Sequence, residues 1–292
     1  MVTEFLSLWV AVSFVVGAIF GSFICCQVRR VIISEKLHGF RKFQQEGSRC
    51  EKCKKPLSWW EMIPVFSWLF LRGKCRTCNS RIGAIELFAE LGLGLAFAVT
   101  TWTFLDRWAS VSGLEAWQVI SLFVFLVLSI GLLAIFVFDF LTGEMPVRSL
   151  YFAIACAVIF GAVDWANMLS SNTFTLAAPL LTVASVAVLS GFYFVLSVAP
   201  ARHSLARKKR EHLVGDGDWL VALPLAIVLA HPLLAVATLF LANIIGALIA
   251  IPFMVTKRWK STTRIPFAPL LIIAFFIIFF ARDFVFKMFM VI

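Results

Sequence analysis

Two aspartates stand at the ends of long apolar segments, where a carboxyl group can do acid–base chemistry. Asp139 ends the apolar run 131–138, and Asp218 begins another apolar segment after a Gly-Asp-Gly turn. Two carboxyl groups that come together can act as a general base and a general acid, one taking a proton while the other donates one. Gly215 and Gly217 let the backbone turn sharply beside Asp218 and admit an extended substrate strand. Ordinary helix ends carry the same residue types, so spacing alone leaves the catalytic and the capping interpretations open.

Four of the seven cysteines form two pairs in one polar loop. They follow the pattern C-x2-C-x21-C-x2-C, at Cys50, Cys53, Cys75 and Cys78. Each pair can clamp one side of a metal ion from a tight turn, and two pairs complete a tetrahedral four-thiolate site. Two disulfides are disfavoured in a reducing compartment, and a rubredoxin-like iron site would be expected beside a redox partner domain. The pattern therefore predicts a structural zinc ion, which supplies folding free energy to a loop with little apolar core.

The composition places both sets of residues in a membrane protein. Hydrophobic residues make up 61% of the chain and charged residues 14%, with a mean hydropathy of +0.95, far from the averages of soluble domains. A spanning helix needs roughly 20 apolar residues to cross a hydrocarbon core about 30 Å thick. The apolar stretches lie near 5–27, 84–105, 117–138, 146–167, 174–199, 218–231, 233–255 and 265–281. We therefore expect an all-α protein with about eight transmembrane helices.

The sixth stretch is short, and it contains Pro224 and ends at His231-Pro232. One long broken helix over 218–255 is the alternative to two separate spans. The expected organisation is a first helix over 1–27, a zinc-binding loop domain over 28–83, and a seven-helix membrane domain over 84–292 that carries both aspartates.

Basic residues orient the expected bundle. Of the 26 Lys and Arg residues, 23 fall on one side of an eight-span arrangement, and 13 of these lie in residues 28–83. The positive-inside rule makes that side cytoplasmic, so both termini are expected outside and the zinc loop and aspartates at the cytoplasmic face. The net charge of +10 comes from loops beside spans, where basic residues fix topology and attract anionic lipid. It does not indicate nucleic-acid binding.

Further motifs follow one another in a definite order along nearly the whole chain. They are Gly21-Ser22-Phe23 with Arg30, the cysteine loop from Arg49 to Leu87, Asp139 seven residues before Pro146, Gly215-Asp-Gly-Asp218, and Ile265-Pro-Phe-Ala-Pro269. In this order on eight helices they resemble the type IV prepilin peptidases, or leader peptidases/N-methyltransferases. This family is a branch of the intramembrane aspartyl proteases that carry the G-x-G-D signature.

The resemblance implies cleavage of a short basic leader from prepilin or pseudopilin substrates at the cytoplasmic face of the bacterial inner membrane. It also implies N-methylation of the new amino terminus with S-adenosylmethionine, and it makes Asp139 and Asp218 the catalytic pair. A helix N-terminus favours an anion and a C-terminus disfavours it, so we expect Asp218 as the ionised base and Asp139 as the acid. Arg30, Arg81 and Glu86 are candidates for binding the substrate or the methyl donor.

Two other classes of function stay open. A zinc-bearing membrane transporter would carry acids at mid-membrane and an inverted repeat between its halves, and neither feature is apparent. A non-catalytic prepilin-binding assembly protein is the other alternative. It rests on Val147 and Leu220, where the family commonly has an acid and a lysine, while Cys25 stands where the family usually has asparagine.

Overall fold

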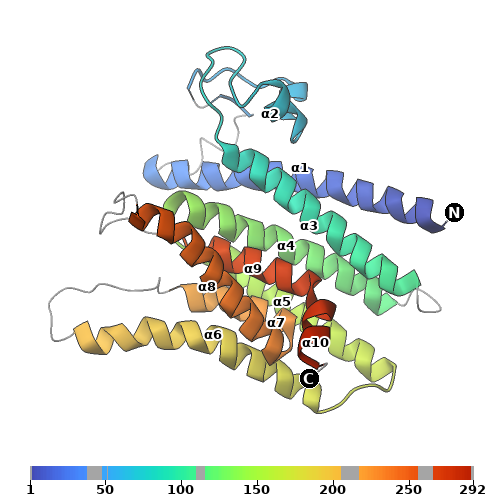
Figure 1. The fold of residues 1–292 in the computed structure, drawn as a ribbon. Coiled ribbons are helices and arrows are strands. Elements are labelled where there is room, and N and C mark those ends of the chain that lie inside the picture. Colours follow the sequence, from blue (N-terminus) through green and yellow to red (C-terminus); the bar gives the residue numbers. More distant parts are fainter. Residues whose placement is uncertain are drawn as a thin grey trace. The chain divides into compact units, whose positions relative to one another are not determined.

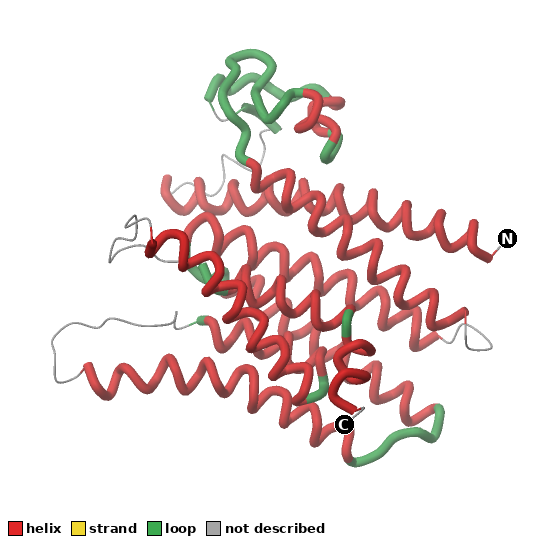
Figure 2. Tube along the Cα trace, viewed as in Figure 1, coloured by secondary structure: helices red, strands yellow, loops and turns green. Residues whose placement is uncertain are grey.

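The fold is known from a computed structural model that describes residues 2–37, 48–50, 52–109, 116–204, 217–255 and 266–290. These residues form helices and loops without a strand, apart from two isolated bridges (Figures 1 and 2). In chain order the helices are α1 (Val2–Leu37), the 3-10 helix η1 (Trp59–Met62), α2 (Phe66–Phe70), α3 (Ala84–Ala109), α4 (Ala116–Thr142), α5 (Val147–Ser170), α6 (Ala177–Ser204), α7 (Asp218–Leu229), α8 (Pro232–Val255), α9 (Ala268–Phe280) and α10 (Arg282–Met290).

Six of these helices are long and apolar enough to cross a membrane: α1, α3, α4, α5, α6 and α8. A seventh candidate is the pair α9 and α10, which is bent by 72°. Helix α7 has 12 residues and at about 1.5 Å per residue reaches only about 18 Å, so it is an apolar helix too short to span alone. The prediction of an all-helical membrane protein with a cysteine lobe between its first two long helices is confirmed.

The expected boundary between the sixth and seventh apolar stretches is a tight reversal. Helix α7 ends at Ala230, whose φ of 51° is left-handed, and α8 begins two residues later at Pro232. The two helices contact each other, and α8 runs back beside α7 (Figure 1). The alternative of one long broken helix over 218–255 is therefore wrong.

The chain divides into two compact units, Met1–Ser112 and Gly113–Ile292. In the first unit, α1 and α3 pack against each other over much of their length. A Cβ on Gly17 would lie 2.7 Å from the carbonyl oxygen of Leu93, and a Cβ on Gly21 would lie 2.7 Å from that of Ala89. Such close backbone approach is how small residues join helices in a bilayer. The division of the chain into residues 1–27, 28–83 and 84–292 stays a prediction.

In the second unit, the two shortest apolar helices, α7 and α9, lie inside the bundle. Helix α7 contacts α5, α6, α8 and α9, while α9 contacts α4, α7, α8 and α10. A helix that is apolar all round belongs in a core or a membrane. The ring of Phe125 on α4 stacks on Phe279 of α9, with centroids 4.4 Å apart. This contact joins the first part of α4 to the end of α9, whereas α7 packs mainly against α5 and α6.

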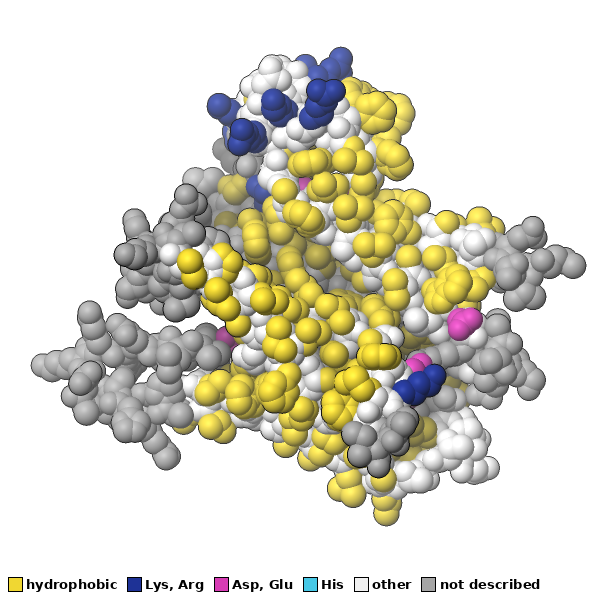
Figure 3. Space-filling model, viewed as in Figure 1, with side chains coloured by type: hydrophobic (Ala, Val, Ile, Leu, Met, Phe, Trp, Pro, Cys, Tyr) yellow, Lys and Arg dark blue, Asp and Glu magenta, His cyan; other side chains and the backbone are white. Residues whose placement is uncertain are grey.

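Large hydrophobic side chains cover much of the outer surface in the view of Figure 3, whereas Lys and Arg side chains gather on the cysteine lobe. Among the exposed apolar residues, Phe123 is 67% exposed and Leu180 69%. In water such surface would be costly, but against lipid tails it is the expected exterior of a membrane protein.

Candidate active site and metal centre

Asp139 lies in the last turn of α4 and is 4% exposed. The backbone N–H of Ala268, the first residue of α9, donates a hydrogen bond to its carboxylate. The Oδ2 atom of Asp139 is buried and has no hydrogen-bond partner among the described residues. Because a buried polar atom without a partner costs free energy, this oxygen marks Asp139 as a candidate for a group that meets a ligand.

Asp218 is the first residue of α7 and is 3% exposed. It follows Gly217, the N-cap, whose φ of −101° is open to any residue. A Cβ on Gly217 would lie only 2.6 Å from Cγ of Met145. Since Met145 belongs to the loop that follows Asp139, this contact brings the turn before α7 against the end of α4. Gly215, the other predicted glycine of the turn, lies outside the described residues.

A tyrosine that sequence analysis did not single out completes this region. Tyr193 of α6 is 2% exposed, and its ring centroid lies 5.2 Å from that of Phe267, the N-cap of α9. The charge of Asp218 acts on its hydroxyl group. The end of α4, the starts of α7 and α9, and the middle of α6 therefore meet around the two carboxylates. The motif at 265–269 marked the start of α9, but no signal in the sequence marked Tyr193.

The four predicted cysteines come together in the lobe of the first unit. Their sulfurs all lie within 4.8 Å of one another, and Sγ of Cys50 is 3.8 Å from Sγ of Cys78. Four sulfurs about 2.3 Å from a zinc ion at tetrahedral corners are about 3.8 Å apart. A disulfide needs about 2.05 Å. The cluster thus has the dimensions of a four-thiolate metal site, and it can hold a metal ion.

The two cysteine pairs sit in equivalent turns. In the first turn the backbone N–H of Lys54 donates to the carbonyl of Cys50 at 2.9 Å, and the N–H of Cys50 donates to Lys55 at 3.0 Å. In the second turn, Asn79 donates to Cys75 at 2.9 Å and Cys75 donates to Ser80 at 2.8 Å. Lys54 and Asn79 also share a positive φ, 60° and 53°. The repeated geometry points both pairs of sulfurs at one centre.

Hydrogen bonds in these turns act on the thiols. The backbone N–H of Cys53, assisted by that of Lys52, lowers the pKa of Cys50 to about 6. The hydroxyl and backbone N–H of Ser80 lower the pKa of Cys78 below its usual range. The N–H of Lys55 favours the thiolate of Cys53, but desolvation and the neighbouring sulfurs outweigh it and raise that pKa to about 11. The turns therefore favour the thiolates of Cys50 and Cys78, and the thiolate is the metal-binding form.

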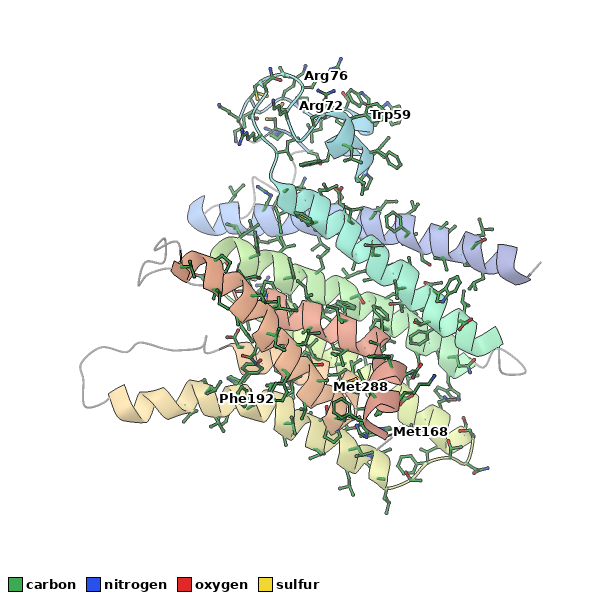
Figure 4. The ribbon with its side chains drawn as sticks, viewed as in Figure 1. Trp59, Arg72, Arg76, Met168, Phe192 and Met288 are labelled. Atoms are coloured by element: carbon green, nitrogen blue, oxygen red, sulfur yellow. The ribbon has the colours of Figure 1, made fainter. Side chains whose placement is uncertain are left out.

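Basic side chains surround the cysteine cluster. Lys52, Lys54 and Lys74 are exposed on the lobe, and Figure 4 labels Arg72 and Arg76 there. The guanidinium of Arg76 lies over the ring of Trp60, 5.2 Å from its centroid. These cations offset part of the negative charge that four thiolates and one divalent ion would carry.

The predicted ligand-binding residues Arg30, Arg81 and Glu86 do not form one group. Glu86, in the first turn of α3, forms an ion pair with Arg29 of α1, a residue that the sequence analysis passed over in favour of its neighbour Arg30. Arg81 is exposed in the lobe, opposite Lys74 in an isolated bridge.

Glu90, one turn after Glu86, is 6% exposed and ties the lobe to α3. Its Oε2 accepts a hydrogen bond from the backbone N–H of Val65 at 2.6 Å, and its carboxylate is also bonded by the side chain of Ser22 on α1. Val65 has a φ of 65°, which is strained for a β-branched residue. The sequence analysis did not single out Glu90, although the repeat of acids one turn apart at the start of an apolar helix could have indicated it.

Comparison with known proteins relates both regions to one family. Residues 15–104, which contain the cysteine lobe, match the bacterial peptidase A24 N-terminal domain. A prepilin leader peptidase/N-methyltransferase of Vibrio cholerae is 28% identical over 278 residues, which cover 95% of this chain and 97% of the relative. Over nearly its whole length the chain is similar to prepilin leader peptidase/N-methyltransferases. The resemblance inferred from the motifs is thereby confirmed.

Two other prepilin leader peptidase/N-methyltransferases match the chain over different extents. The prepilin leader peptidase/N-methyltransferase of Bacillus subtilis is 26% identical over 264 residues, or 89% of each chain. That of Myxococcus xanthus is 37% identical over 84 residues, which cover 29% of this chain and 23% of the relative. No solved structure matches the chain significantly.

Proposed function

We propose that this protein cleaves the basic leader from prepilin or pseudopilin substrates at the cytoplasmic membrane face and then N-methylates the new amino terminus. The observation that supports the peptidase proposal is the pair of buried carboxylates at the end of α4 and the start of α7. The close approach of Gly217 to Met145 brings these two helix ends together. The support from relatives is that a protein similar over 95% of the chain carries the name prepilin leader peptidase/N-methyltransferase.

In the proposed mechanism, Asp218 takes a proton from a water molecule whose oxygen attacks the scissile carbonyl carbon. Asp139 donates a proton to the carbonyl oxygen, which gives a neutral tetrahedral intermediate. The C–N bond then breaks as the proton on Asp218 passes to the leaving amine and Asp139 recovers its proton. Two carboxyl groups this close to one substrate share one proton and titrate as a pair.

The assignment of roles rests on helix ends and on the unpartnered oxygen. Asp218 begins α7, so the positive helix end stabilises its anion. Asp139 lies in the last turn of α4, where the negative helix end destabilises its anion. The N–H of Ala268 at the start of α9 donates a hydrogen bond to Asp139 and offsets part of this destabilisation. The buried Oδ2 of Asp139, without a partner among the described residues, is where a carboxyl proton would meet a substrate carbonyl. Infrared titration of each carboxyl that finds Asp139 ionised first would reverse the assignment.

Substrate recognition follows from the charges near the dyad. Glu144, exposed in the loop after α4, would attract the basic leader, and a hydrophobic substrate helix would lie against the apolar helix faces. Prepilins of this family carry a glutamate soon after the cleavage point, for which Arg30 or Arg81 would be the partner.

The four cysteines would hold a structural zinc ion, which supplies folding free energy to the lobe. Methyl transfer would take the methyl group of S-adenosylmethionine to the free amine: a C–N bond forms, the C–S bond of the sulfonium breaks, and the amine loses a proton. We place the donor site within the first unit, which carries the lobe and Glu86 with its partner Arg29. Incubation of the protein with labelled methyl donor and a cleaved pilin peptide tests this step separately.

The peptidase proposal is tested by prepilin cleavage in liposomes with Asp139→Asn and Asp218→Asn. Both variants should be inactive, whereas Asp106→Asn, an exposed aspartate at the end of α3, should cleave like the wild type. Full cleavage by either dyad variant would refute the mechanism. Wild-type protein that binds a prepilin without cleaving it would favour the assembly-protein alternative, and ion flux through the liposomes would favour the transporter.

A further inference from the structure

Tyr193 carries a phenolic proton that no described residue accepts. It is one of two tyrosines in the chain and is 2% exposed, and a buried phenol needs polar partners. Asn243 of α8 donates from Nδ2 to the phenolic oxygen at 3.4 Å. This bond uses the oxygen as an acceptor, so the proton remains to be donated. Within the described part of the chain no acceptor receives it.

Tyr193 lies on the side of α6 that packs against the start of α7. Ser190, one turn earlier on α6, donates from Oγ to the carbonyl oxygen of Trp219 at 2.8 Å. Residues three apart share one face of a helix, so Tyr193 is directed to the same end of α7. Trp219 directly follows Asp218, and the carboxylate of Asp218 is near enough to act electrostatically on the phenol. The nearest charged candidate for the phenolic proton is therefore Asp218.

The ring of Tyr193 also supports the start of α9. Its centroid lies 5.2 Å from that of Phe267, at an interplanar angle of 57°. Phe267 is the N-cap of α9, and the next residue, Ala268, donates its N–H to Asp139. A single side chain thus contacts the element that holds one aspartate and lies within electrostatic reach of the other.

We propose that Tyr193 is a positioning residue of the aspartate pair, an inference that rests on the proposed peptidase function. Its ring spaces the starts of α7 and α9, and its hydroxyl donates a hydrogen bond that orients the Asp218 carboxylate toward the attacking water. Catalytic hydrogen bonds are often long in a free enzyme and shorten when substrate binds, so this bond forms fully in the substrate complex.

The experiment compares Tyr193→Phe, which keeps the ring and removes the proton, with a matched Tyr→Phe control. The control is Tyr151→Phe on α5, because Tyr151 is 67% exposed. Each protein is reconstituted in liposomes with a prepilin, and kcat, KM and the melting temperature are measured. We expect Tyr193→Phe to lower kcat about tenfold or more, as for a lost hydrogen bond to a charged group. Its KM and melting temperature should stay at the wild-type values, and the control should match the wild type throughout.

A second variant separates positioning from packing. Tyr193→Leu removes the proton and the ring, so it should lower both kcat and the melting temperature. A kcat for Tyr193→Phe within twofold of the wild type would overturn the proposal. So would a loss of kcat that only follows a loss of folded protein.

The same liposome assay includes Asp139→Asn and Asp218→Asn. These variants distinguish failure of the peptidase mechanism from failure of the role proposed for Tyr193. If either aspartate variant cleaves, the peptidase mechanism itself has failed. If both are inactive and Tyr193→Phe equals the wild type, only the role of Tyr193 has failed.

Discussion

Gly217→Ala should disable cleavage through the geometry of one contact. The backbone of Gly217, with φ −101° and ψ −11°, suits alanine, so the effect comes from space alone. The added Cβ would lie 2.6 Å from Cγ and 3.3 Å from Cβ of Met145. Relief to an ordinary contact of 3.4 Å requires a shift of about 0.8 Å at the Cγ atom. Because Asp218 is the next residue, the carboxylate would move with the turn.

The size of the effect follows from this shift. Overpacking of this kind costs about 1–3 kcal/mol of stability, and a misplacement of about 1 Å at a reacting group lowers the rate on the order of 100-fold. We therefore expect Gly217→Ala to lower the kcat of prepilin cleavage by roughly 10- to 100-fold, and to lower the free energy of unfolding by no more than about 3 kcal/mol.

A compensating variant tests whether the contact with Met145 causes the loss of activity. Met145→Ala removes the Cγ and Sδ atoms that meet the new methyl group, so Gly217→Ala with Met145→Ala should recover most of the lost activity. Gly92→Ala is the matched control, since a Cβ there meets nothing within 4 Å. The steric account is wrong if Gly217→Ala cleaves at the wild-type rate, or if the double variant is no better than Gly217→Ala.

Four further predictions concern the first unit of the chain. Cys75→Ser should abolish stoichiometric zinc in the purified protein and expose the lobe to limited proteolysis, because the metal supplies the lobe's folding free energy; a zinc content equal to that of the wild type would contradict this. The folded-state pKa of Cys50, about 6, lies below its ordinary value of 9.0, so the contribution of Cys50 to the stability of the metal-free lobe should be complete above pH 9 and be lost as pH falls through 6, as a pH series of urea unfolding with Cys50→Ala as control measures. Removing the hydroxyl that helps lower the pKa of Cys50 and Cys78 with Ser80→Ala should move the pH of metal release upward, which a titration of cobalt-substituted protein measures and an unchanged midpoint would disprove. Glu90→Leu leaves the N–H of Val65 without its acceptor and should cost about 1–3 kcal/mol, seen as faster proteolysis of the lobe than in Glu90→Gln, which keeps an acceptor oxygen.

Signals that are local in the chain were sufficient for the metal centre and the helices. A spanning helix is defined by its own length and hydropathy, and the six long spans follow from them. A four-thiolate site is defined by two short turns, so the spacing of Cys50, Cys53, Cys75 and Cys78 anticipated a cluster whose sulfurs lie within 4.8 Å. Asp139 and Asp218 were selected because a charged group beside an apolar run is costly unless it has a use.

Which faces of those helices meet was decided only by the tertiary structure. In a bilayer the lipid-facing and the buried sides of a helix are both apolar, so hydropathy does not tell them apart. That is why sequence analysis named Arg30 where Arg29 pairs with Glu86, and why it passed over Tyr193. The sequence by itself indicated the membrane environment, the long apolar helices, the four cysteines and the two aspartates. The approach of Gly217 to Met145, the N–H of Ala268 on Asp139 and the contact of Tyr193 with Phe267 depend on packing between residues distant in the chain. No local pattern encodes this packing.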